Sequence, residues 1–112
     1  MDGTVGIITL FAVGLLISVL GVINMTGNIS TLHEYHRSRV TEENVKPFGR
    51  LVGLGTLIIG VSVIVFGVLF AIHEAVGGAA LVIVGTALLA VGIIAGMTVS
   101  FLAMKKYNGG IF

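Results

Sequence analysis

Residues 51–72 read LVGLGTLIIGVSVIVFGVLFAI and contain no charged side chain, which decides the class of this protein. An α-helix rises about 1.5 Å per residue, so roughly 20 apolar residues cross the roughly 30 Å of hydrocarbon in a bilayer. Pro47 stands shortly before the stretch and suits the first turn of a helix, where its missing N–H would have no partner anyway. The pattern predicts a transmembrane helix over about residues 47–72.

Two more uncharged apolar stretches flank this one along the chain, over about residues 4–24 and about 77–104. The whole chain is 56% hydrophobic and 10% charged, with a mean hydropathy of +1.15, whereas roughly a quarter of the residues in soluble domains are charged. A soluble fold is thereby excluded. We expect an all-α fold in which residues 1–112 form a single integral membrane domain, with three transmembrane helices and a loop over about residues 25–46.

Lysine and arginine occur in only two of the segments outside the three spans. Four lie between the first and second spans or at the very start of the second, and two follow the third, whereas the N-terminal segment and the second turn have none. Because basic residues accumulate on the cytoplasmic side, we expect a plasma-membrane protein with its N-terminus outside and its C-terminus in the cytoplasm. Asp2 in place of a basic start argues against a cleaved signal peptide. The predicted contacts to lipid headgroups or to a partner are Arg37, Arg39, Lys46, Arg50, Lys105 and Lys106.

The predicted cytoplasmic loop has a helical signal of its own. Thr31 and Glu34 have the spacing of a capping box, and the residues Ile29, Leu32, His36 and Val40 recur on one helical face. We therefore expect a short amphipathic helix over about residues 31–40, lying on the membrane surface.

Glycine recurs every seven residues within the spans. A seven-residue period keeps a position on one face of a left-handed helix pair, and glycine lets two backbones approach closely. Frequent glycine in membrane helices is the simpler explanation for the pattern. If the series is functional, it packs the three helices of one chain or joins copies into a homo-oligomer. The predicted packing positions are Gly14, Gly21, Gly53, Gly60, Gly67, Gly78, Gly85, Gly92 and Gly96.

Few side chains could support catalysis or ligand binding. His33 and His36 could share one helical face, but the spacing differs from that of zinc proteases and no third ligand is in prospect, so we expect no metal and no cofactor. The chain contains no cysteine, and no basic cluster is dense enough for nucleic acid. The polar side chains within the spans are all uncharged, which argues against an ion-coupled pump. We expect serine and threonine there to bond to their own helices.

Residues 27–37 and 46–53, which include GNISTLHEYHR and KPFGRLVG, resemble the cytoplasmic loop of short three-span prokaryotic membrane proteins of unknown function. The chain is more distantly similar to the membrane segments of SdpI-type immunity proteins. The resemblance implies an architecture and no residue-level activity.

Three functions fit these observations to different degrees. The first is a non-enzymatic scaffold or accessory subunit, which pairs through its helices with copies of itself or with another membrane protein. The alternative is a small oligomeric channel or transporter with its pathway between subunits, which would require a polar stripe facing a common axis. A membrane enzyme ranks third, because no catalytic motif is present.

Overall fold

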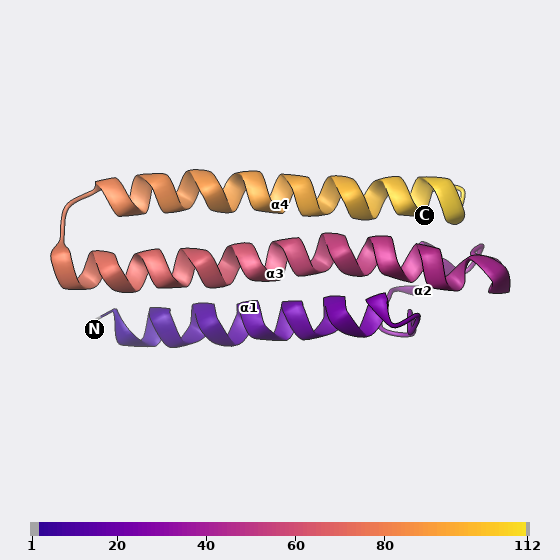
Figure 1. The fold of residues 1–112 in the computed structure, drawn as a ribbon, viewed down its shortest axis with the longest axis horizontal. Helices are drawn as coiled ribbons and strands as arrows, with labels where there is room; N and C mark the ends of the chain where they lie inside the picture. The colour runs from indigo at the N-terminus through magenta and orange to yellow at the C-terminus, as the bar shows by residue number, and fades with distance from the viewer. Residues whose placement is uncertain (1–2, 112) are drawn as a thin grey trace.

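Three long helices lie side by side in the computed structural model, which describes residues 3–111. They are α1 (Thr4–Met25), α3 (Val45–Val76) and α4 (Ala80–Tyr107). Helix α3 lies in the middle and packs against α1 on one side and α4 on the other, as Figure 1 shows. The described residues contain no strand. The all-α fold with three long apolar helices is therefore confirmed.

Each long helix is long and apolar enough to cross a bilayer. The Cα atoms extend over 51 Å along the longest axis and over 20 and 19 Å across it. Helix α3 has 32 residues and a length of about 48 Å, so its two ends reach beyond the hydrocarbon into the headgroup region. The chain is a multi-pass membrane protein.

Two glycines end α3 later than the apolar pattern suggests. The helix continues through Val76, and Gly77 and Gly78 then adopt φ angles of 76° and 79°, which L side chains rarely adopt. Helix α4 begins at Ala80, so the third span starts three residues after the predicted position 77. Gly78 lies in this turn, and a Cβ added to it would have no neighbour within 4 Å. Its prediction as a helix-packing position is therefore wrong.

The loop between α1 and α3 contains two short helices. They are α2 (Glu34–Arg37) and a 3-10 helix, η1 (Glu42–Asn44), which leads directly into α3. The short helix between the first two spans is thus present, but it is one turn long and does not extend over residues 31–40. His33 precedes it without a side-chain capping bond, and the Thr31 hydroxyl instead accepts a hydrogen bond from Asn24. The capping box therefore does not form.

The fully buried apolar side chains gather at one end of the layer. Phe48 and Val52 of α3 pack with Ala103 and Met104 of α4, and the loop and the C-terminal tail cover them. Along the rest of the three helices many large apolar side chains are exposed. That exposure suits a protein surrounded by lipid, which is as apolar as these side chains.

Candidate functional site at the basic end of the layer

All six lysine and arginine residues lie at one end of the helix layer, which we call the basic end. Lys46 and Arg50 lie in the first turns of α3, Lys105 and Lys106 lie in the last turn of α4, and the remaining two lie in or beside α2. Figure 1 shows these segments together at one end, whereas the α3–α4 turn lies at the other. The charge segregation of the sequence is therefore a spatial segregation across the molecule.

Asn24 fixes the first half of the loop to the end of α1. Its side chain is 2% exposed, and its Nδ2 donates to the carbonyl of Asn28 at 2.9 Å and to the hydroxyl of Thr31 at 2.8 Å. A buried amide without such partners would be costly. Both partners of this amide therefore belong to the loop and not to another long helix.

Asn108 fixes the second half of the loop to the end of α4. Its side chain is 1% exposed, and its Oδ1 accepts the Arg39 backbone N–H at 2.8 Å. Its Nδ2 donates to the carbonyls of Tyr35 at 2.9 Å and Gly110 at 3.0 Å. One side chain therefore joins the loop, α4 and the C-terminal tail. The sequence signal for this role was a lone asparagine before two glycines at the end of a predicted helix.

The basic side chains differ in their surroundings. Arg37 is half-buried, and its Nε donates to the Leu32 carbonyl at 3.1 Å, so this guanidinium also holds the loop. Lys106 places its Nζ 5.2 Å from the centre of the Tyr107 ring, a cation–π arrangement. Lys46, Arg50 and Lys105 are exposed. The basic end thus combines an ordered backbone with several cations available to an anionic partner.

Three rings cluster on the loop around α2. The Tyr35 ring lies 3.8 Å from the ring of His33 and 4.6 Å from that of His36, measured between centroids. Burial, and secondly the neighbouring His33, lower the pKa of His36 from its ordinary value of 6.5. Within residues 3–111, no three His, Cys, Asp or Glu side chains come together as metal ligands would.

The glycine series of α3 packs against α1. A Cβ at Gly21 would lie 2.7 Å from the Leu57 backbone nitrogen, and one at Gly60 would lie 2.6 Å from that of Ser18. These separations are too short for real contacts, so only glycine permits the observed approach. The glycines at this α1–α3 crossing are Gly14, Gly21, Gly49, Gly53, Gly60 and Gly67.

The glycines of α4 pack against the opposite face of α3. Gly96 approaches the carbonyl of Gly55, Gly92 approaches Ser62, and Gly85 contacts the Phe66 ring. The atoms nearest to a Cβ at Gly60 belong to α1, so Gly60 does not pair the second and third spans. Gly55 takes this role and was missed, although its spacing of two residues from Gly53 places it about 200° around the helix, on the other face. Glycine therefore permits the close approach of the helices at both crossings within one chain.

Polar side chains inside the layer bond mainly to their own helices. The hydroxyls of Thr9, Ser18, Thr56, Ser62 and Thr98 each donate to the carbonyl four residues earlier. Ser100 is the exception, because its hydroxyl donates across the helix pair to the Val52 carbonyl at 3.3 Å. The expectation of back-bonding is confirmed for these five residues.

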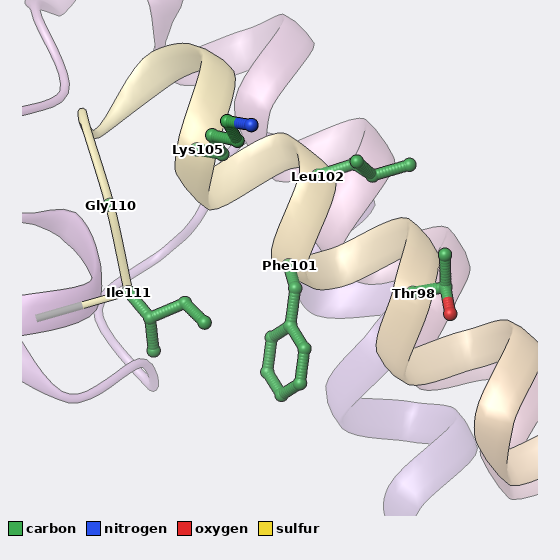
Figure 2. A pocket seen from close by; sticks show the side chains of 6 residues that line it. All are labelled: Thr98, Phe101, Leu102, Lys105, Gly110 and Ile111. Carbon is green, nitrogen blue, oxygen red and sulfur yellow. The ribbon is translucent and has the colours of Figure 1, made fainter.

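An apolar groove lies between the end of α4 and the C-terminal tail, and we call it the tail groove. Its volume is about 330 Å³, and its lining is almost entirely apolar. Figure 2 shows that the Phe101 side chain of α4 and the Ile111 side chain of the tail point to the same side. The six lining residues are Thr98, Phe101, Leu102, Lys105, Gly110 and Ile111.

Comparisons with protein-family models, with curated proteins and with solved structures found no match for the chain. A proposal for its function therefore rests on the geometry of its own residues.

Proposed function

We propose that this protein is a non-enzymatic membrane scaffold or accessory subunit, which presents its ordered basic end to a copy of itself or to another membrane protein. The observation that carries the proposal is the fixation of the loop by Asn24 and Asn108. Both amides are almost fully buried, so the loop backbone is held in one arrangement. An ordered loop keeps its cations at fixed positions, and such a surface can recognise a partner without first losing conformational entropy.

The glycine crossings support the same proposal in a different way. They hold α1 and α4 against α3 mainly by close backbone contact, which can join helices in lipid, where the hydrophobic effect does not. These glycines already pack against helices of the same chain. Association with another membrane protein would therefore use the exposed apolar faces of α1 and α4. Val13 and Leu16 on α1 and Val84 and Leu88 on α4 are examples of such exposed side chains.

The proposal includes an orientation in the plasma membrane. The basic end would face the cytoplasm, with the N-terminus and the α3–α4 turn outside, because all six basic residues lie at that end. The resemblance to short prokaryotic three-span proteins remains a prediction and adds no activity to this proposal.

The channel alternative and the enzyme alternative have less support. A channel between subunits needs polar groups that face a common axis, and the hydroxyls of five serine and threonine residues are instead bonded within their own helices. The enzyme alternative ranks third because the sequence contains no catalytic motif.

The experiment is an intact-mass measurement of the assembly released from native membranes under mild detergent, together with flux in proteoliposomes. The scaffold proposal predicts a defined assembly larger than the 11.6 kDa chain and no ion flux above that of empty liposomes. Release of the chain as a monomer alone would contradict a scaffold. Flux that depends on the assembly would instead establish the channel.

A further inference from the structure

We propose that the tail groove binds one anionic phospholipid, with an acyl chain along the apolar lining and the phosphate beside Lys105. This inference goes beyond the scaffold proposal and does not depend on it. It rests on the shape, the position and the charge of the groove at the end of α4.

The groove runs along α4 from the membrane interior toward the basic end, which is how a lipid molecule lies in a bilayer. Phe101 and Leu102 lie three and four residues after Thr98, and Lys105 lies four and three residues after them, so these residues share one face of α4. Lys105 lies seven positions after Thr98, which corresponds to about 10 Å along the helix. Thr98 lies on the side of the membrane interior and Lys105 lies at the basic end, where lipid headgroups would be.

The C-terminal tail forms one wall of the groove, and hydrogen bonds hold it in place. The tail reverses after α4 because Gly109 adopts a φ of 72°, and the Gly110 N–H donates to the Met104 carbonyl at 3.2 Å. Asn108 also donates to the Gly110 carbonyl, which keeps Ile111 opposite Phe101. The groove volume of about 330 Å³ falls within the range of about 300–1,000 Å³ that is common for small-molecule sites.

Charge and exposure identify the occupant. Among the described residues that line the groove, Lys105 alone is charged, and the other lining side chains are hydrocarbon, aromatic or hydroxyl groups. Leu102 is 60% and Phe101 37% exposed, so the groove opens toward the surrounding lipid. A ligand that matches this surface needs a long apolar part beside a negative charge, which describes a phospholipid of net negative charge. The Arg39 guanidinium near Gly109 adds a second cation beside the tail.

The test is native mass spectrometry of the full-length chain with phosphatidylglycerol and phosphatidylcholine that have identical acyl chains. The wild-type chain should retain one phosphatidylglycerol in preference to phosphatidylcholine. Lys105→Gln should reduce this preference about fivefold, the effect of one lysine near an anionic surface. Lys106→Gln is the matched control, because it removes the same charge from the same turn, but Lys106 packs over Tyr107 and does not line the groove.

A second pair of variants tests the acyl chain. Leu102→Ala should reduce retention of both lipids, whereas Leu88→Ala should not, although both leucines are exposed on α4. Equal retention of the two lipids by the wild-type chain, or equal effects of Lys105→Gln and Lys106→Gln, would overturn the proposal. A disulfide between copies of a Leu102→Cys variant of this cysteine-free chain would overturn it as well, because a second copy would then occupy the groove.

Discussion

Replacement of Asn108 by alanine should release the second half of the loop and leave the first half in place. The substitution removes the acceptor of the Arg39 N–H and the donor to the Tyr35 carbonyl. Asn24 would still hold the segment around Asn28 and Thr31 from the other side, since its bonds do not involve Asn108. The two halves of the loop should therefore respond separately.

The size of the effect on the loop follows from the two loop backbone groups that lose their partner, the Arg39 N–H and the Tyr35 carbonyl. An unsatisfied buried group costs about 1–3 kcal/mol. The two hydrogen bonds of Asn108 to the loop are only partly buried, so water can replace part of each, and the lower end of that range applies. The opening free energy of the segment should fall by about 2 kcal/mol in total, which corresponds to about thirtyfold faster exchange.

Amide hydrogen exchange of the full chain in lipid nanodiscs measures this directly. Residues 35–40 should exchange about thirtyfold faster in Asn108→Ala than in the wild-type chain, and residues 28–32 should be nearly unchanged. Asn44→Ala is the matched control, because Asn44 precedes α3 without a side-chain capping bond. Unchanged exchange at residues 35–40, or the same acceleration in the control, would refute the role assigned to Asn108.

Three further predictions concern the glycine crossing, the orientation and the loop. Gly60→Leu should lower thermal stability in detergent by about 1–3 kcal/mol, and Gly85→Leu by less, because backbone cannot yield at Gly60 whereas the Phe66 ring can rotate away from Gly85. Equal losses would contradict the assigned contacts. Single cysteines at Ser38 and Glu74 should be labelled from opposite sides of intact cells, and labelling of Glu74→Cys only after permeabilisation would show the inverted orientation. Burial and then His33 lower the pKa of His36, so the part of the loop's stability that depends on neutral His36 is fully present above about pH 6.5 and is lost as the pH falls through the lowered pKa. Exchange in α2, corrected for its intrinsic pH dependence, should accelerate on acidification, and an identical response in His36→Gln would exclude this histidine as the cause.

The long helices were predictable because length and charge determine them almost alone. No alternative fold places more than 20 consecutive apolar residues in contact with lipid and satisfies every backbone group. The ends of the helices depend on finer features, since Gly77 terminates α3 through a positive φ that the apolar pattern does not reveal. The predicted third span therefore began three residues too early.

The partners of individual residues were less predictable for a physical reason. A seven-residue glycine period indicates a common face, but it does not say which neighbouring helix lies against that face. Helix α3 has neighbours on both sides, so Gly53 and Gly55 serve different crossings. The loop depended on long-range contacts in the same way. Thr31 could cap a helix by its spacing, yet the buried amide of Asn24 needed its hydroxyl, and the local helix remained one turn long.

The distribution of interactions along the layer supports the proposal that the basic end is the place for recognition. In the middle of the layer the helices meet through glycine, and the hydroxyl groups are bonded within their own helices, so little remains there to distinguish one partner from another. At the basic end the chain leaves the regular helix, and its backbone groups need directional partners, which Asn24 and Asn108 provide. Irregular backbone of this kind is tolerated where protein or water can satisfy it, which is at the membrane surface and not within the hydrocarbon. The loop backbone must find its hydrogen-bond partners at the membrane surface. An ordered loop there would also hold its cations at headgroup depth, where an anionic lipid or an acidic partner can reach them.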